Sequence, residues 1–364
     1  MKHAYKEILF GKKKYILIEI LLILLMFMVL FLSGLAEGLG RAVTSAIENM
    51  DADHFIIDDS AEQLITVSSI ETEDFDTVAS IAGANAAPLD IQRMYIKKAG
   101  EDEKINMTYF AVKPGSFTEP SVFEGTGLSE SSAPNPILLD DDYKLEGIEL
   151  NDKVYDSSTD IEFTVAGFVD DEMYGHTSVG FISTESYTAL REALSPMYTP
   201  KYHTIAIKGD FDESALPKGL ELVPKQEVIE SIPSYSAEHT TITMIVWVLV
   251  VVSAVIIGIF NYILTLQKRR QFGIMKAIGM TGGELAGIIV SEVCIISVFA
   301  AVISLALTFA MAAGLPETMP FYLTVTNAVT ATAVFVVVSI FSSLLSIVNI
   351  SRIDPVTVIG GGEE

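Results

Sequence analysis

A single apolar run restricts the folds open to this chain more than any other feature. Residues 242–266 carry no charged side chain and read ITMIVWVLVVVSAVIIGIFNYILTL. A helix needs about 20 apolar residues to cross a bilayer, so this run is long enough. Lys268, Arg269 and Arg270 follow it after one glutamine. Because basic residues gather at the cytoplasmic ends of membrane helices, the run is predicted to leave the membrane on that side.

Three other apolar runs complete a pattern of four predicted spans. The first begins at Ile16, behind a lysine-rich N-terminal segment. It is longer than the core of a typical signal peptide, and no clear cleavage site follows, so an uncleaved helix is favoured over a cleaved signal. The third and fourth runs cover residues 286–313 and 327–348, and Arg352 follows the last. With both termini in the cytoplasm, every short loop obeys the positive-inside rule.

The negative charge of the chain is concentrated in one segment. Half of the 364 residues are hydrophobic, yet the formal net charge is −24. Residues 37–239 hold 39 of the 47 acidic side chains and only 13 of the 23 basic ones. Such an acidic segment repels nucleic acid and anionic lipid head groups, so no nucleic acid partner is expected. The one cysteine, Cys294, excludes an intrachain disulfide and a cysteine metal cluster.

Residues 37–239 are predicted to form a folded α+β domain on the extracellular side, since about two hundred residues can bury a core of their own. The first helix is expected to continue into this domain, because apolar side chains recur at helical spacing through residues 34–50. Apolar runs bounded mostly by turn residues predict strands at residues 54–59, 63–70, 105–113, 135–141, 161–171, 179–183 and 201–209. Helices are predicted at residues 74–83 and 183–194.

The predicted fold class is therefore an α-helical membrane protein of the cell membrane, with four transmembrane helices and a large α+β extracellular domain inserted between helices 1 and 2. The predicted segments are a cytoplasmic amphipathic segment (1–14), helix 1 (15–36), the extracellular domain (37–239), helix 2 (240–266), a cytoplasmic segment (267–285), helix 3 (286–313), an extracellular loop (314–326), helix 4 (327–348) and a cytoplasmic tail (349–364). A change of shape in the domain would be passed to helices 1 and 2.

No catalytic motif accompanies this layout. The chain lacks a G-x-x-x-x-G-K-[ST] phosphate loop, an H-E-x-x-H zinc motif and a G-x-S-x-G nucleophile elbow. The spans carry few ionisable groups, and Glu19, Glu284 and Glu292 lie at or near span ends. Ion-driven transporters usually place charges or broken helices near the midplane. The chain is therefore predicted to be a transport subunit and not an enzyme, with energy supplied by a separate ATPase.

The segment behind the second span carries a family resemblance. Residues 270–279 read RQFGIMKAIG and residues 352–356 read RIDPV. Together with the four-span layout, they resemble the FtsX-like, MacB-like ABC transporter permeases. The resemblance implies that this segment couples to the ATPase, through Arg270, Phe272, Gly273, Lys276, Gly279 and Asp354.

The coupling segment combines apolar and basic side chains. The apolar ones expected to fill a groove on the partner are Phe272, Ile274, Met275 and Ile278, while basic neighbours would meet acidic residues at the rim. A loop anchored to lipid head groups would explain the charge but not the apolar face.

A narrower resemblance extends over the rest of the chain. Four segments, FLSGLAEGLGR (31–41), DDEMYGHTS (170–178), SIPSYSAEH (231–239) and LPETMPFYLT (315–324), look like the permease subunit of the haem-regulated haem exporters of Gram-positive bacteria. The resemblance implies a homodimer of permeases that works with two ATPase subunits. Haem would be the transported ligand, drawn sideways out of membrane lipid, with no cofactor bound permanently and with ATP and magnesium in the partner ATPase.

A membrane-level haem site needs an apolar slot, a ligand to the iron and a cation for the propionates. The residues that could supply these groups are Glu238, Tyr235, Tyr174, Arg41, His239 and Met28. If the second helix begins early, Tyr235, Glu238 and His239 share one face, and Glu238 or Tyr235 could ligate the iron. Ordinary explanations compete: an interfacial tyrosine, an acid in the first turn of a helix, and methionines that only pack.

Two other functions remain open. Export of another amphiphile, such as an antimicrobial peptide, a lipid or a drug, fits the same layout and predicts no change in the Soret band when haem is added. A mechanotransmitter that transports nothing would instead control a cell-wall hydrolase through its extracellular domain. It predicts an extracellular protein partner and no ATPase activity stimulated by a substrate.

Overall fold

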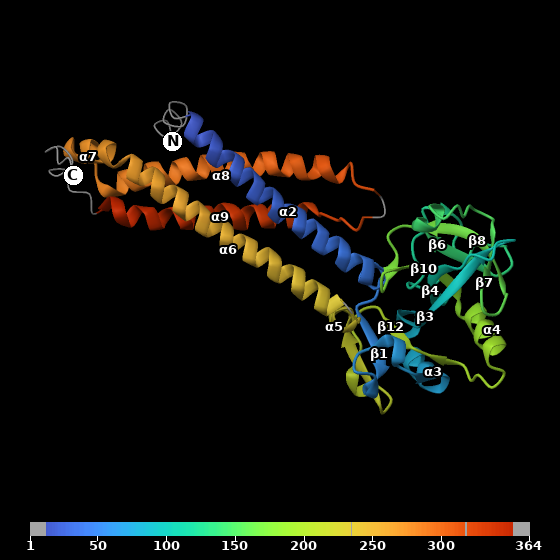
Figure 1. The fold of residues 1–364 in the computed structure, drawn as a ribbon. Coiled ribbons are helices and arrows are strands. Elements are labelled where there is room, and N and C mark those ends of the chain that lie inside the picture. The colour runs from blue at the N-terminus through green and yellow to red at the C-terminus, as the bar shows by residue number, and fades with distance from the viewer. Residues whose placement is uncertain (1–11, 234, 317–318, 352–364) are drawn as a thin grey trace. The chain divides into compact units, whose positions relative to one another are not determined.

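The computed structural model describes residues 12–233, 235–316 and 319–351 (Figure 1). The chain divides into two compact units. The membrane unit consists of Met1–Leu39 with His239–Glu364, and the inserted unit is Gly40–Glu238. Helices α2 (Lys12–Glu48) and α6 (Tyr235–Gln267) contribute residues to both units.

The membrane unit is built from four long helices, which are α2, α6, α8 (Gly282–Ala312) and α9 (Val325–Ser351). Each contains a stretch long and apolar enough to cross a membrane, which confirms the four predicted spans. Since α2 runs on to Glu48, the predicted continuation of the first helix is also confirmed. Since α6 begins at Tyr235, the condition for placing Tyr235, Glu238 and His239 on one helix is met.

Three buried hydroxyl groups of the membrane unit are paired within their own helices. Ser253, Thr265 and Thr308 each donate to the carbonyl oxygen four residues earlier, at 2.7, 2.8 and 2.8 Å. A polar group left without a partner in hydrocarbon costs several kcal/mol, so this local pairing lets small polar side chains line the contacts between helices.

Two glycines of α2 make room for the segment that precedes α9. A Cβ atom on Gly34 would collide with the ring of Phe321, and one on Gly38 would collide with the backbone of Pro320. The Tyr322 N–H donates to the Gly34 carbonyl oxygen at 3.0 Å. The two glycines therefore fix this segment against α2 by direct backbone contact.

The inserted unit is an α+β domain. Its strands are β1 (His54–Asp58), β2 (Ile70–Glu71), β3 (Ala86–Lys98), β4 (Ile105–Val112), β5 (Glu124–Gly125), β6 (Pro136–Asp140), β7 (Lys153–Asp156), β8 (Glu162–Val169), β9 (Met173–Tyr174), β10 (Thr177–Ser183), β11 (Lys201–Tyr202), β12 (Thr204–Ile207) and β13 (Leu220–Pro224). Its helices are α3 (Thr72–Ala82), α4 (Thr184–Leu194) and α5 (Lys225–Ser231). The 11-stranded sheet has the order β13-β1-β12-β3-β4-β10-β6-β8-β5, with β7 paired to β3 and β8, and β9 to β10. Strands β2 and β11 form a separate pair.

Most predicted strands and both predicted helices of this domain are confirmed, but the strand predicted at residues 63–70 is wrong. That segment holds a 3-10 helix, Ile65–Val67, and only the first residue of β2. Glu62 and Gln63 have φ angles of 51° and 62°, and this left-handed backbone cannot continue an extended strand.

The longest strand, β3, has 13 residues and is missing from the sequence prediction. It begins with alanine, proline and aspartate, which favour strands weakly. Its pairing with β4, β12 and β7 supplies what local propensity lacks. Strands β7 and β13 were likewise recognisable only from their partners.

Candidate functional site

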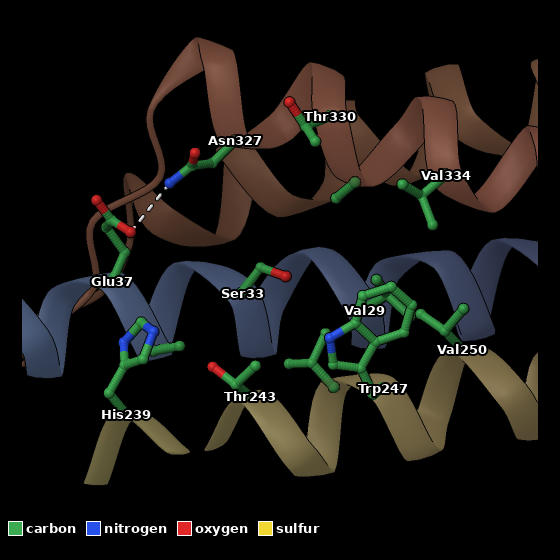
Figure 2. A pocket seen from close by; sticks show the side chains of 13 residues that line it. Val29, Ser33, Glu37, His239, Thr243, Trp247, Val250, Asn327, Thr330 and Val334 are labelled. Atoms are coloured by element: carbon green, nitrogen blue, oxygen red, sulfur yellow. Dashed lines mark hydrogen bonds between the residues drawn. The ribbon is translucent and has the colours of Figure 1, made fainter. Parts of the chain in front are cut away.

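A pocket of ≈ 260 Å³ lies between α2, α6 and α9, within the membrane unit (Figure 2). Each helix contributes side chains at helical spacing, such as Val29, Ser33 and Glu37 of α2. Residues spaced by three or four share one face of a helix, so the pocket wall consists of three such stripes.

The two ends of the pocket differ in polarity. Figure 2 shows Glu37, His239 and Asn327 together at one end, and Val250 and Val334 at the other. The Asn327 side-chain amide donates to the Glu37 carboxylate at 3.0 Å. Such a pocket can take the apolar body of an amphiphile at one end and its polar groups at the other.

The middle of the pocket contains the only tryptophan of the chain, Trp247. Its indole lies on α6 between Thr243 and Val250, which also line the pocket. A large flat aromatic ring offers stacking surface to a planar ligand.

The residues predicted for a haem site are not all brought together. His239 lines the pocket, whereas Met28 is an exposed residue of α2 that does not. Glu238 lies one residue before His239 and its carboxylate contacts the His176 imidazole, Oε1 to Nε2, at 3.2 Å. Tyr235 packs against the apolar core of the inserted unit.

Tyr174 and Arg41, two of the residues predicted for a haem site, are engaged in contacts inside the inserted unit. The ring of Tyr174 packs edge-on against Phe110 at 5.5 Å between ring centroids, and burial raises the pKa of Tyr174 to about 12. This works against the phenolate that would ligate iron. The Arg41 guanidinium donates to Asp171 at 2.8 Å and to Glu48 at 3.3 Å. Arg41 would have to leave these carboxylates to bind a propionate.

The predicted coupling segment contains a short helix, α7 (Arg269–Ala277). Gly279, with a φ of 102°, ends the turn that follows, and a capping box at Thr281 starts α8. Arg270 is exposed, Lys276 is half-buried and Gly273 is buried, while Asp354 lies outside the described residues.

Phe272 does not belong to the exposed apolar surface predicted for this segment. It is 1% exposed and packs with Leu285, Ile289 and Val293. These three residues are spaced by four and form a stripe on α8, which draws the Phe272 ring inward. Ile278, at 77% exposed, remains available to a partner.

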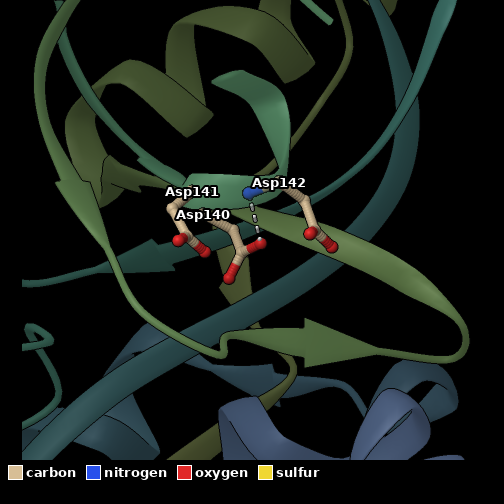
Figure 3. Close-up of side chains that lie close together, drawn as sticks. All are labelled: Asp140, Asp141 and Asp142. Carbon is tan, nitrogen blue, oxygen red and sulfur yellow. Dashed lines mark hydrogen bonds between the residues drawn. The ribbon is translucent and has the colours of Figure 1, made fainter. Parts of the chain in front are cut away.

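Three adjacent aspartates, Asp140, Asp141 and Asp142, lie close together at the end of β6 (Figure 3). The buried Asp140 carboxylate accepts the backbone N–H groups of Asp142 and Glu172 at 3.2 and 2.6 Å. The cluster thereby anchors the turn after β6 to the segment before β9.

Sequence reasoning missed Glu37, Trp247 and Asn327 as site residues. They stand on three helices that are far apart in the chain, so no motif spacing connects them. One signal was available, because Trp247 is the single tryptophan and stands within a predicted span.

Comparison with known proteins agrees with this layout. Residues 243–355 match the model of the FtsX-like permease C-terminal family. The "Putative hemin transport system permease protein HrtB" of Staphylococcus haemolyticus is 29% identical over 366 residues, covering 100% of both chains. An uncharacterised ABC transporter permease of Mycobacterium bovis is 23% identical, covering 98% of this chain and 99% of its own. The extracellular domain of the transporter YknZ from Gram-positive bacteria aligns with a TM-score of 0.33 at 13% identity, over 47% of this chain and 98% of that domain.

The matched C-terminal region and the full-length relatives relate this chain to ABC transporter permeases. The chain carries an FtsX-like permease domain and is homologous to the HrtB haem transport permeases.

Proposed function

We propose that this chain is the permease subunit of an ATP-driven exporter that removes haem from the membrane. The pocket between α2, α6 and α9 is the observation that carries the proposal. Haem combines an apolar ring with two propionates and an iron that accepts imidazole. The pocket offers an apolar wall, the flat ring of Trp247 and the His239 imidazole.

The size of the pocket supports a site shared by two copies of the chain. Sites that enclose a whole drug-sized ligand usually measure about 300–1,000 Å³. At ≈ 260 Å³, one pocket would cover only part of a haem. A homodimer would supply the remaining wall, and lipid would give haem a sideways entrance.

ATP hydrolysis would occur in a separate ATPase subunit that binds α7 from the cytoplasm. The exposed Ile278 and Arg270 provide one apolar and one basic contact for that subunit. In this proposal both termini are cytoplasmic, and closure of the ATPase moves the helices and ejects haem outward.

The tryptophan provides a direct test. Haem accepts the emission of a nearby indole, and Trp247 is the only tryptophan, so quenching in nanodiscs reports on the pocket without a label. We expect saturable quenching together with a Soret shift, both weakened by His239→Ala. The matched control is His54→Ala, which changes a half-buried histidine of the inserted unit. Quenching that only rises in proportion to haem dissolved in lipid would contradict the proposal.

Export of another amphiphile is favoured by the mostly apolar lining of the same pocket. In that case the candidate amphiphile, and not haem, would shift the Trp247 emission in a saturable way. The Soret band would then not respond to the protein.

A further inference from the structure

Three polar side chains from three segments of the membrane unit meet in one buried cluster, here called the membrane triad. It consists of Tyr15 on α2, Lys268 directly after α6, and Glu292 on α8. The Lys268 ammonium donates to the two Glu292 carboxylate oxygens at 2.9 and 2.8 Å and to the Tyr15 hydroxyl at 2.7 Å. The Tyr15 hydroxyl in turn donates to Glu292 Oε2 at 3.1 Å.

The membrane triad is mostly shielded from solvent. The side chains of Lys268 and Glu292 are only 13% and 6% exposed, and Tyr15 is buried. An ammonium has three protons to donate, and Tyr15 and Glu292 offer three acceptor oxygens to Lys268. A buried ion pair is tolerated only with such complete geometry, because desolvation of both charges is costly.

The same lysine stands at the start of the coupling helix. Lys268 is the N-cap of α7, and its carbonyl oxygen accepts the Phe272 N–H at 2.9 Å. Phe272 packs on Leu285, Ile289 and Val293 of α8, and Glu292 is the neighbour of Val293. Helix α7 is therefore attached to α8 at two points, one ionic and one apolar.

The backbone departs from regular helix between α6 and α7. At Lys268 the φ and ψ angles are −93° and 3°, away from regular helix. Without a side-chain attachment, a push on α7 would bend the chain at Lys268 and leave α6 in place.

We infer that the membrane triad is a rigid joint that makes α2 and α8 move when α7 is pushed. This inference rests on the proposed function, in which an ATPase subunit pushes α7. Tyr15, Lys268 and Glu292 are positioning residues in this step, because they act through α7 and touch neither ATP nor the transported ligand.

The inserted unit offers a matched control with the same three residue types, here called the surface triad. Lys153 contacts Glu162 at 2.6 Å, and the Tyr155 hydroxyl donates to Glu162 at 2.7 Å. The side chains of Lys153 and Glu162 are 56% and 36% exposed. Substitutions in the surface triad remove the same chemical groups as those in the membrane triad, but from a solvent-exposed position.

The first experiment measures ATPase coupling in the complex with the co-expressed ATPase subunit, in nanodiscs with haem. Lys268→Met and Glu292→Gln should keep the ATPase subunit bound but lower the haem-stimulated rate about tenfold, within the usual size of coupling between sites. The exchange K268E/E292K should restore most of the rate, which a general packing defect would not allow. The inference would be overturned if the single variants kept the wild-type haem-stimulated rate. It would also be overturned if the exchange variant folded but did not recover that rate.

The second experiment does not depend on the proposed function. Cys294→Ser removes the only cysteine, after which spin labels at the exposed Leu17 and Ile278 report the distance between α2 and α7. We expect a narrow distribution of the distance between the two labels. Glu292→Gln should broaden this distribution, and K268E/E292K should narrow it again. The control Glu162→Gln should leave it unchanged. If the wild-type complex shows no haem-stimulated ATPase while the distances behave this way, the proposed function fails and the joint stands. A distribution insensitive to Glu292→Gln would overturn the joint itself.

Discussion

The membrane triad and the surface triad have the same side-chain chemistry and nearly the same distances, but opposite surroundings. Lysine contacts glutamate at 2.8 Å in the first and 2.6 Å in the second. The membrane triad is buried, while water reaches the surface triad from several sides. Exposed pairs gain little, because solvent screens them and already solvates each charge when the pair breaks. Removal of one charged partner from the membrane triad would leave the other charge buried and without compensation.

The largest expected difference comes from removing the carboxylate of each triad. Glu292→Gln should lower the free energy of unfolding by about 3–5 kcal/mol, because it leaves the Lys268 charge buried without its partner. Glu162→Gln should leave unfolding unchanged within error. Unfolding of the full chain in mixed SDS micelles measures both. Similar losses for the two variants would show that burial does not distinguish them.

Glycines of the membrane helices give a second matched pair. Gly38 lies against the Pro320 backbone, whereas Gly287 on α8 has no atom within 4 Å of the position of an added Cβ. Gly38→Ala should therefore cost about 1–3 kcal/mol through overpacking. Gly287→Ala should be neutral or slightly stabilising, since alanine favours a helix over glycine. Thermal unfolding in detergent compares the two, and an unchanged melting temperature in Gly38→Ala would contradict the close contact.

Two glutamates of the inserted unit should respond to pH with opposite signs. Burial raises the pKa of Glu172 from 4.5 to about 8, partly offset by the Asn49 hydrogen bond. The folded state then keeps a proton that the unfolded state loses, so stability is greatest below pH 4.5 and falls as pH rises towards 8. Hydrogen bonds from Lys153 and Tyr155 lower the pKa of Glu162, so its contribution is present above pH 4.5 and is lost as pH falls below it.

Ionisation of Glu172 should lower the local stability by about 2 kcal/mol between pH 5 and pH 8, after the contribution of the neighbouring Asp140 is discounted. Burial raises the Asp140 pKa to about 7, so Asp140 contributes to the same slope. Hydrogen exchange of the peptide that contains residues 170–178, measured in the full chain, reports this slope. Glu172→Gln should reduce it, and Glu162→Gln should not. If the local stability of this peptide increased as pH rises from 5 to 8, the raised pKa of Glu172 would be contradicted.

The smallest expected effect concerns the two tyrosines. Tyr15→Phe removes hydrogen bonds from a buried network and should cost about 1 kcal/mol. Tyr155→Phe removes one half-exposed hydrogen bond, and water replaces it. The SDS unfolding assay applies again, and a cost in Tyr155→Phe as large as in Tyr15→Phe would contradict the role given to burial.

Sequence patterns predicted elements whose cause is local. The four apolar runs predicted four spans because bilayer thickness sets their length, and helical spacing predicted the extension of α2. Strand β3 and the interior position of Phe272 were not predictable, since both depend on partners distant in the chain, the neighbouring strands for β3 and the α8 stripe for Phe272. The pocket was missed for the same reason, and of the predicted ligand residues only His239 lines it.

The large sheet of the inserted unit ends, among the described strands, in β5 and β13. Strand β5 has two residues, Glu124 and Gly125, while β13 carries Glu221 and ends at Pro224. Short strands, charges and proline all discourage the addition of a strand from another molecule. Neighbouring copies of the chain would therefore gain little by joining these edges into a continuous sheet. Self-association of the chain is thereby directed to surfaces other than strand edges.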